Sequence, residues 1–449
     1  MRERRLRAMK KDAPPSPVPE AERPYAVPAN WRWVRLVGGF AECLDNFRKP
    51  VNATERARRE GDIPYYGATG QVGWIDDYLT DEQLVLLGED GAPFLDLMKD
   101  KAYIIEGKAW VNNHAHILRS FFGSIGNHYL VHYLNNFDYK GYVNGTTRLK
   151  LTQANMSAIP IPLPPLPEQR RIVERIESLF SKLDEARAKV QAVLDGAEAR
   201  RAAILHRAFT GELTARWRAE RGLGMEGWRE KKFSDLGQTK LGKMLDSAKN
   251  TGAETLYLRN ANVRWFDFDL DDIGVMLASE KDRANLSINN GDLLICEGGE
   301  PGRCAVWTGG DNAYIFQKAL HRFRPVNDVS SQFIAFYLYY FNANGALQEY
   351  FTGTTIKHLT GKSLANVPVR IPPLHEQNEI VRILDGLLSH ERRVHDAASA
   401  MVERIDLIKK AVLARAFRGE LGTNDPTEAS DAALQRSICF KAERVNRSS

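Results

Sequence analysis

Apolar residues recur at alternating steps of four and three along two separate stretches of this 449-residue chain. Such spacing is the heptad seam of a helix that packs on another helix. The first seam comprises Ile172, Ile176, Leu179, Leu183, Ala186, Val190, Val193 and Ala197. The second comprises Ile380, Leu384, Leu387, Glu391, Val394, Ala398, Met401, Ile405, Ile408 and Val412. The pattern predicts two long helices of about 40 residues, each near 60 Å at ~1.5 Å per residue.

The ends of both helices carry the expected local signals. Pro167 and Glu168 suit a first turn, where a missing N–H costs nothing and a carboxylate meets the positive end of the helix dipole. Gly211 and Gly419 stand where a glycine closes a helix. One narrow apolar stripe cannot be buried alone, so each helix needs a partner of equal length. We predict that the two pack on each other in antiparallel fashion, because a copy on the same chain is always at high local concentration. A coiled coil between two chains is the alternative.

Both helices lie in a duplicated stretch. Residues 145–213 align without a gap on residues 353–421, which lie 208 positions later, with 24 identities in 69. The identities gather in Gly-Thr-Thr and Leu-Thr before each helix, Pro-Pro-Leu-x-Glu-Gln at its entry, and Arg-Ala-Phe-x-Gly-Glu-Leu at its exit. The chain is therefore one half-molecule built twice, and such a protein suits a two-part target.

Two further segments, 25–160 and 223–367, differ from the helices and mostly from each other. Only their openings match, as Trp31 with Leu36 echoes Trp228 with Phe233. Both contain short apolar runs broken by glycine and asparagine, which predict strands, and each also carries a helix-like stretch, the clearer one in the second segment. These runs are Leu84–Leu87, Ala102–Ile105, Leu293–Cys296 and Tyr314–Phe316, and the helical stretch is Phe333–Phe341. The predicted fold class is α/β (α+β): two globular domains separated by two long helices packed as an antiparallel coiled coil, with pseudo-two-fold symmetry.

The predicted boundaries follow from these segments. We expect a disordered leader over 1–24, because basic residues are followed by a proline-rich stretch. The first domain then spans 25–160, and the first helical spacer with its linker spans 161–222. The second domain spans 223–367, the second helical spacer 368–421, and a polar tail 422–449.

Polar and basic residues on the predicted turns are candidate DNA readers. Asparagine and glutamine pair bidentately with adenine, and arginine with guanine, although each such residue alone is more often a turn former. In the first domain the candidates are Tyr65, Tyr66, Thr69, Gln71, Asn112, Asn113 and His114. In the second they are Arg259, Asn260, Asn262, Arg264 and Gln317.

Composition and missing motifs narrow the functional class. The net charge of +5 permits a polyanionic partner without requiring one. The chain has no apolar run long enough for a membrane span, no secretory signal, and four cysteines without metal-binding spacing, so we expect a cytoplasmic protein without a metal. Methyltransferase, phosphate-loop and serine-hydrolase motifs are absent from the sequence, and Gly361-Lys362-Ser363 lacks the upstream glycine of a phosphate loop. We therefore predict a non-catalytic chain.

From Trp31 to Leu421 the chain resembles the specificity subunit of type I restriction-modification systems. The resemblance rests on the entry and exit motifs of both helices and on the Gly-Thr-Thr before each one. It also rests on Tyr65-Tyr66-Gly67-Ala68-Thr69-Gly70, Ile75-Asp76-Asp77-Tyr78, Gly88-Glu89-Asp90-Gly91, Asn113-His114-Ala115-His116, and Gly291-Asp292-Leu293-Leu294 with Phe316-Gln317. These are similar to target recognition domains of that family.

The resemblance implies a division of labour. Each domain would read one half of a bipartite site in double-stranded DNA, and the helices would set the spacer. Two methyltransferase subunits, which hold S-adenosylmethionine, would dock on the helical region, and a restriction or motor subunit would join the complex. We expect no cofactor in this chain. The helix-end residues predicted to support docking are Glu168, Gln169, Phe209, Glu376, Gln377 and Phe417.

Two other classes remain as alternatives. One is a coiled-coil adaptor whose globular ends bind proteins and not DNA, and the other is a fused enzyme with an unrecognised catalytic domain. The sequence gives neither the DNA site, the spacer length nor the base methylated.

Overall fold

The computed structural model describes residues 18–246 and 250–428. The chain divides into two units, which we describe separately. Unit 1 contains residues up to Val190 together with those from Ala400 onward, and unit 2 runs from Gln191 to Ser399. Both boundaries fall inside helices, because each unit takes the helical segments that pack on its own domain.

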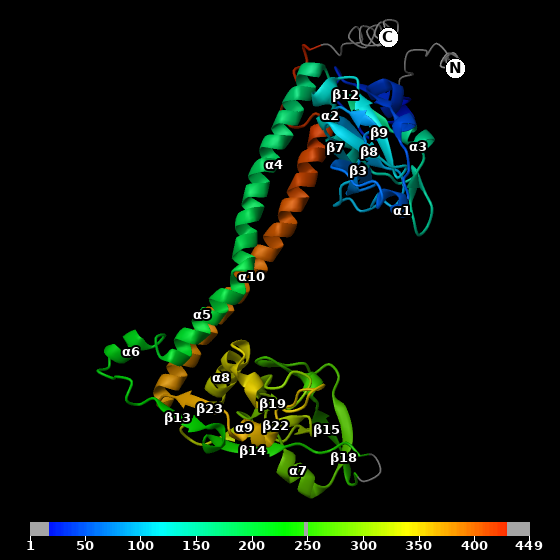
Figure 1. Ribbon diagram of the computed structural model, residues 1–449. Coiled ribbons are helices and arrows are strands. Elements are labelled where there is room, and N and C mark those ends of the chain that lie inside the picture. The colour runs from blue at the N-terminus through cyan, green and yellow to red at the C-terminus, as the bar shows by residue number, and fades with distance from the viewer. Residues whose placement is uncertain (1–17, 247–249, 429–449) are drawn as a thin grey trace, which may run out of the picture. The chain divides into compact units, whose positions relative to one another are not determined.

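Unit 1 has a four-stranded antiparallel sheet in the order β2-β9-β6-β7, with helix α2 against it (Figure 1). A second four-stranded sheet has the order β4-β3-β8-β5. The elements of these sheets are β2 (Ala41–Cys43), β3 (Ile63–Gly67), β4 (Gly70–Ile75), β5 (Thr80–Asp81), β6 (Leu84–Gly88), β7 (Ala102–Ile105), β8 (Lys108–Val111), β9 (Ala115–Ser120) and α2 (Gly123–Asn136). The connecting elements are η1 (Glu20–Glu22), β1 (Arg32–Arg35), η2 (Leu36–Phe40), η3 (Asp45–Phe47), α1 (Ala53–Arg56), β10 (Val143–Asn144), β11 (Lys150–Leu151), α3 (Gln153–Ala158) and β12 (Pro160–Leu163).

Unit 2 repeats the strand order of the larger sheet in a different sequence, and its second sheet has three strands instead of four. Its larger sheet has the order β14-β22-β19-β20 with helix α8 against it, and its second sheet has the order β18-β15-β21. Its strands are β13 (Arg229–Lys232), β14 (Gly237–Leu241), β15 (Ala253–Leu258), β16 (Val263–Arg264), β17 (Asp267–Phe268), β18 (Gly274–Ala278), β19 (Leu293–Cys296), β20 (Cys304–Val306), β21 (Ile315–Phe316), β22 (Leu320–Pro325) and β23 (Pro368–Ile371). Its shorter helices are α6 (Ala215–Ala219), η4 (Phe233–Asp235), η5 (Asn260–Asn262), α7 (Glu280–Leu286), α8 (Ser331–Ala343), η6 (Ala346–Tyr350) and α9 (Gly361–Ala365). The predicted runs at Leu84, Ala102 and Leu293 are strands, and the predicted helix at Phe333 is part of α8.

The matched domain openings have a structural cause. In unit 1, β1 pairs with β12 just before the long helix, and the Trp31 indole N–H donates to Glu168 at the start of that helix at 2.7 Å. In unit 2, β13 pairs with β23, and the Trp228 indole donates to Glu376 at 3.1 Å. The first residue after each strand, Leu36 or Phe233, is fully buried. Each domain is thus held to the beginning of the helix that follows it.

The long helices are α4 (Leu166–Asp195), α5 (Ala197–Thr210) and α10 (Leu374–Phe417). In unit 1, Asp184 pairs with Lys409, and Arg187, three residues later, pairs with Asp406, three residues earlier. The pairing therefore runs antiparallel, as predicted. In unit 2, Arg200 of α5 pairs with Glu391 of α10 at 3.0 Å, so the charged position in the second seam has its own counter-ion.

The first predicted helix and part of both seams need correction. Gly196 divides the first helix into α4 and α5, although Gly196 itself keeps a right-handed helical conformation. Five seam positions are off by one residue, whereas Leu179, Glu391 and Val394 are partly buried as predicted. Val193 is 38% exposed and Met401 is 46% exposed, whereas the neighbouring Leu194 and Val402 are partly buried. The same shift affects Ala186, Leu387 and Ile408.

The predicted leader is ordered where the structure describes it. Val18 is fully buried, its carbonyl accepts a hydrogen bond from Arg23 at 3.2 Å, and residues 20–22 form η1. The prediction of disorder is therefore wrong for residues 18–24, and residues 1–17 lie outside the described part.

The first residues of the predicted tail also pack on unit 1. Asn424 donates to Glu168 at 2.9 Å, and the Glu428 carboxylate binds the Arg171 guanidinium through two hydrogen bonds of 2.9 and 2.8 Å. Residues 429–449 lie outside the described part. Within residues 18–246 and 250–428, no helix is both long and apolar enough to cross a membrane.

Candidate nucleic-acid interface

The predicted reading residues gather at one topological position in each unit. In unit 1, β3 and β8 run parallel, and the Asn112 N–H after β8 donates to the Tyr66 carbonyl at 3.1 Å. In unit 2, β15 and β21 run parallel, and the Gln317 N–H donates to the Leu258 carbonyl at 3.0 Å. Asn112 and Gln317 are therefore equivalent positions. Residues that are distant in the sequence thus meet at the carboxyl ends of two parallel strands.

Two of the seven predicted readers in unit 1 are core residues. Tyr65 is 1% exposed, and its hydroxyl accepts a hydrogen bond from the Val51 N–H at 3.2 Å. Asn112 is 7% exposed, and its Oδ1 accepts from the His114 N–H at 2.8 Å. The Tyr65 hydroxyl and the Asn112 Oδ1 have partners inside the fold and both side chains are buried, so we correct the prediction that they contact bases. Tyr66 is half-buried against Tyr103, with ring centroids 6.0 Å apart.

The other candidates in unit 1 reach the surface. Thr69 is exposed in the turn between β3 and β4, and Gln71 is exposed on β4, where its amide donates to the Gly73 carbonyl at 3.2 Å. Asn113 is exposed beside His114, whose Nδ1 lies 2.8 Å from Asp90. These four side chains remain available for contact with a ligand.

In unit 2 most of the candidates are engaged within the domain. Asn262 is 3% exposed, and its amide donates to the Asp272 carbonyl at 2.9 Å, so it is a structural residue and not a reader. Arg259 pairs with the Asp272 carboxylate at 2.7 Å, which raises the pKa of the guanidinium. Arg264 is more exposed and pairs with Asp269 at 3.0 Å.

The two remaining candidates of unit 2, Asn260 and Gln317, are partly buried. Asn260 follows β15 and Gln317 follows β21, and these two strands pair with each other. Asn260 donates weakly to the Gly298 carbonyl at 3.4 Å. The buried Oε1 of Gln317 has no hydrogen-bond partner among the described residues.

A loop pair beside this position recurs in both units. The Leu151 N–H donates to the Glu89 carbonyl at 2.7 Å, and the Leu359 N–H donates to the Glu297 carbonyl at the same distance. The carbonyls of the same leucines accept from buried histidines, His116 in unit 1 and His321 in unit 2, each at 2.9 Å. The repeated Leu-Thr is thus the anchor of this loop pair, which sequence analysis missed because the histidines lie in the divergent segments.

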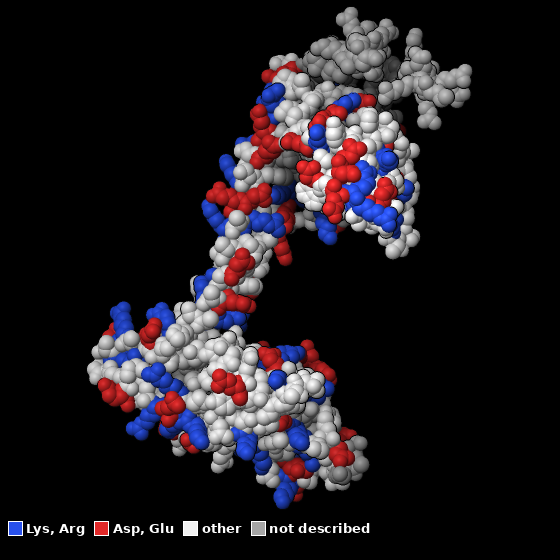
Figure 2. Space-filling model, viewed as in Figure 1, with Lys and Arg blue, Asp and Glu red and all other residues white. Residues whose placement is uncertain are grey.

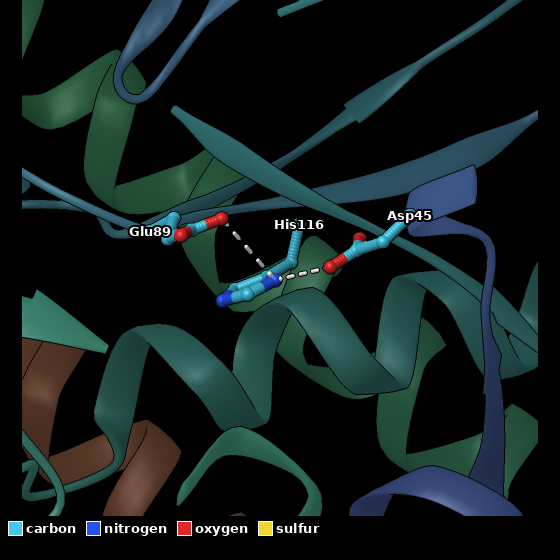
Figure 3. A group of neighbouring side chains, drawn as sticks. All are labelled: Asp45, Glu89 and His116. Atoms are coloured by element: carbon cyan, nitrogen blue, oxygen red, sulfur yellow. Dashed lines mark hydrogen bonds and ion pairs between the residues drawn. The ribbon is translucent and has the colours of Figure 1, made fainter. Parts of the chain in front are cut away.

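In unit 1 the anchoring histidine belongs to a charged cluster. Figure 3 shows the His116 ring between Asp45 and Glu89, with Nδ1 2.7 Å from Asp45 and 3.9 Å from Glu89. Arg48 pairs with both carboxylates, and Lys150 lies 3.1 Å from Glu89. Burial by itself raises the pKa of Asp45, but the His116, Ile117 and Arg48 contacts outweigh it and lower that pKa.

The donors of this cluster lie close enough together to suggest a metal, within 4.8 Å of one another. Both ring nitrogens of His116 face oxygen acceptors, so the form that satisfies both donates twice and offers no lone pair to a cation. Arg48 and Lys150 already balance the two carboxylates. The arrangement therefore fits an ion-pair network that fixes the Glu89 turn.

Among the described residues, the equivalent histidine of unit 2 forms no ion pair. His321 is 1% exposed, and its Nδ1 has no partner among the described residues. Burial lowers its pKa, although the Leu359 hydrogen bond and Glu297 act in the opposite direction. The two units thus share the hydrogen bond to leucine but not the electrostatics around it.

Basic and aromatic side chains interleave on the surface of unit 1. Arg59 lies over the Trp110 ring at 4.5 Å, Arg56 over Tyr65 at 4.8 Å, and Lys108 over Tyr78 at 4.7 Å. Figure 2 shows lysine and arginine gathered over the region of β3 and α1. The three arginines within residues 56–59 were a sequence signal for this surface that we did not use.

The six predicted docking residues are buried inside their own units. Glu168, Gln169 and Gln377 are 0% exposed, and Glu376 is 2% exposed. Phe209 packs edge-on against Tyr337 in unit 2, and Phe417 packs in the same way against Tyr129 in unit 1, each pair with centroids 5.2 Å apart. These side chains hold the helix ends to the domains, so they do not form an exposed docking surface. We correct the prediction accordingly.

Comparisons with known proteins agree with this architecture. The family model for the type I restriction modification DNA specificity domain matches residues 28–194 and again 225–397. A type I restriction enzyme specificity subunit of Haemophilus influenzae is 30% identical over 349 residues, covering 77% of this chain and 84% of that protein. The EcoKI specificity subunit of Escherichia coli is 26% identical, covering 71% of this chain and 72% of that protein.

Solved structures show the same fold. The HsdS subunit of Thermoanaerobacter tengcongensis superposes with a TM-score of 0.58 at 19% identity, covering 89% of this chain and all of that one. A chain from a type I restriction-modification assembly gives a TM-score of 0.62 at 20% identity, with the same coverage. The adaptor alternative finds no support among these relatives. The duplicated frame, the two matched domain segments and the relatives together place this chain in the family of type I restriction-modification DNA specificity subunits.

Proposed function

We propose that each unit reads one half of a two-part site in double-stranded DNA, and that this chain contributes recognition without catalysis. One observation carries the proposal. The two units have the same strand order in the larger sheet and the same Leu-Thr-anchored loop pair, yet they present different side chains at the carboxyl ends of the equivalent parallel strands. A shared frame with different polar groups suits two half-sites of different sequence.

The exposed members of the predicted set support direct base contacts. Asn113 and Gln71 carry amides that can pair with adenine, and Arg264 can pair with guanine. Arg259 and Arg264 would have to exchange Asp272 and Asp269 for DNA. In unit 1, the exposed Asn113 side chain forms no hydrogen bond with another described residue, so we place more of the discrimination by that unit on Asn113.

The basic and aromatic surface of unit 1 supports contacts with the DNA backbone. Arg56, Arg59 and Lys108 lie over aromatic rings, which hold their charges at the surface. Phosphate contacts release counterions, so we expect affinity for DNA to fall steeply as salt rises.

The family supplies the proposed partners. We propose that two methyltransferase subunits, holding S-adenosylmethionine, dock on the long helices, and that a restriction or motor subunit completes a cytoplasmic complex. Apolar side chains exposed on the helices support such docking better than the buried helix ends do. They are Met401, Leu407 and Ile408 in unit 1 and Val193 and Leu387 in unit 2.

The decisive experiment compares methylated bases in a host genome with and without this gene. We expect a two-part motif that disappears when the gene is deleted. The purified chain with its methyltransferase subunit should then bind that duplex in preference to an unrelated one. An unchanged methylation pattern together with no retention of DNA at low salt would refute the proposal.

The spacer is tested by lengthening both helices where they face each other. Seven residues inserted after Arg187 and seven after Ile405 keep the heptad phase, because Arg187 pairs with Asp406. Each insertion adds roughly 10 Å, the length of about three base pairs. We expect a longer spacer between unchanged half-sites, whereas inserting only after Arg187 should disrupt the pairing. Changed half-sites with a spacer of constant length would contradict the proposal that the paired helices set the spacer.

A further inference from the structure

The Gly-Thr-Thr that precedes each helix region forms an exposed loop in both units. The loops are Gly145-Thr146-Thr147 in unit 1 and Gly353-Thr354-Thr355 in unit 2, and all six residues are exposed. They adjoin domains whose surface residues have diverged. Identical exposed residues in that setting need a cause that both units share.

The shape of the turn explains the glycines but not the threonines. Gly145 has φ +106° and Gly353 has φ +91°. A Cβ on Gly145 would lie 2.4 Å from the Arg148 carbonyl oxygen, and one on Gly353 would lie 2.2 Å from that of Ile356. Glycine is therefore required at both positions. Among the described residues, none forms a hydrogen bond with the hydroxyl of Thr146, Thr147, Thr354 or Thr355, so the fold itself does not need them.

Each loop lies next to the residues that differ between the units. In unit 1, Arg148 binds Asp90 at 2.7 Å, and Asp90 binds His114 at 2.8 Å. In unit 2, the ring of His358 lies against Gly298, since a Cβ there would be 3.0 Å from Nδ1. The Gly298 carbonyl in turn faces Asn260. The constant loop therefore borders the variable polar group in both units.

Basic side chains accompany both loops, and in unit 1 they pair with Asp90 and Glu89. The Arg148 and Lys150 side chains are 64% and 52% exposed. Lys357 and Lys362 are exposed near the second loop, and in the described part of the chain neither forms an ion pair. Hydroxyls, backbone N–H groups and cations are the groups that contact DNA phosphates.

We propose that the two Gly-Thr-Thr loops are phosphate contacts that do not depend on base sequence. The hydroxyl of each threonine donates to a phosphate oxygen and so sets the neighbouring reading residues in register with the bases. Phosphates are the same in every half-site, which explains why these exposed residues are identical while their neighbours differ. This inference rests on the proposed DNA recognition.

The test replaces hydroxyls without changing size. The full chain with its methyltransferase subunit is prepared as Thr146→Val/Thr147→Val and as Thr354→Val/Thr355→Val. Thr239→Val, at an exposed position on β14, is the matched control. Affinity is measured for the duplex with the mapped site and for an unrelated duplex, and the methylated sequence is mapped again.

Each double variant should weaken binding to both duplexes by the same factor, about tenfold, and leave the methylated sequence unchanged. Lys357→Gln should reduce the slope of log affinity against log salt concentration by about one. Thr239→Val should bind like the wild type.

Three results would overturn the inference. The double variants could bind as tightly as the wild type. One half-site could change in sequence, which would make the loop a base reader. The methyltransferase subunit could dissociate while binding of DNA by the chain alone stays constant, which would make the loop a protein contact. If the wild type itself binds no DNA, the proposed function fails and not this step alone.

Discussion

Replacing Glu376 by glutamine should destabilise unit 2 far more than the same change at Glu168 destabilises unit 1. The two glutamates start the equivalent long helices and each accepts a hydrogen bond from a tryptophan indole. Their other partners differ. Glu376 binds the Arg218 guanidinium and the Thr214 hydroxyl, whereas the described hydrogen-bond partners of Glu168 are the neutral Trp31 indole and Asn424 amide.

The magnitudes follow from burial. The Arg218 and Glu376 side chains are 7% and 3% exposed, so Glu376→Gln leaves a buried cation without its counter-charge, at a cost of about 3–5 kcal/mol. At Glu168 an amide oxygen can still accept from Trp31, so Glu168→Gln should cost no more than about 1 kcal/mol. Burial raises the pKa of Glu168 despite the Trp31 and Asn424 hydrogen bonds. The ionised form is therefore disfavoured in the fold, and the wild type loses stability as the pH rises through the raised pKa. The difference in stability between Glu168→Gln and the wild type should then shrink.

Hydrogen exchange measures each unit separately, because a chain of two units need not unfold in one step. We expect faster exchange in β13 and the first turns of α10 for Glu376→Gln, and little change in β1 for Glu168→Gln. The double variant Arg218→Met/Glu376→Met should recover most of the loss, since an apolar pair replaces the buried charges. Equal effects of the two glutamine variants would refute the electrostatic argument.

Three further predictions concern unit 1. Asn113→Ala should reduce the free energy of binding to the mapped site by about 1–3 kcal/mol and relax the preference at one base position of the methylation motif. An equal loss of affinity for all DNA sequences would exclude a base contact. The pKa of Asp45 in the folded protein lies below its ordinary value of 3.8. The contribution of Asp45 to the stability of unit 1 should therefore be complete above that ordinary value and be lost as the pH falls through the lowered pKa. The melting temperature of the wild type should fall over this pH range, and His116→Gln should reduce the fall. The same fall in both proteins would contradict the role of the His116 cluster. Glu428→Gln should cost less than about 1 kcal/mol in a melting experiment, because the pair with Arg171 is partly exposed; a larger loss would mean that the 422–428 segment holds unit 1 together.

The heptad seams show how far periodicity reaches. Positions Leu183, Val190, Leu384 and Ile405 are buried or partly buried as predicted, since a 3.5-residue repeat returns to the same face. Five other positions, Ala186 and Met401 among them, were wrong by one residue, whereas Glu391 and Val394 were right. Arg187 is partly buried in place of Ala186, because its long apolar stem covers the seam while its charge meets Asp406. A rule that scores only apolar side chains misses such a position.

The reading residues show a different limit. The residue types suggested DNA contact, but Tyr65, Asn112 and Asn262 are buried and form hydrogen bonds within the fold. Exposure depends on which strands pair, and the parallel pairs β3–β8 and β15–β21 join residues far apart in the sequence. Local patterns do not contain this information.

The amino-acid sequence by itself determined the duplication, the antiparallel helix pair and the family, because each depends on repeated local spacing. Only the tertiary structure decided that the two divergent domains share the strand order of their larger sheets and that buried histidines anchor the repeated Leu-Thr in both. It also decided that Glu168 and Glu376 sit in the core. The physical reason is that partners such as Trp31 and Glu168 are in contact although 137 positions separate them in the sequence. Long-range contacts of this kind leave no periodic signal in the sequence.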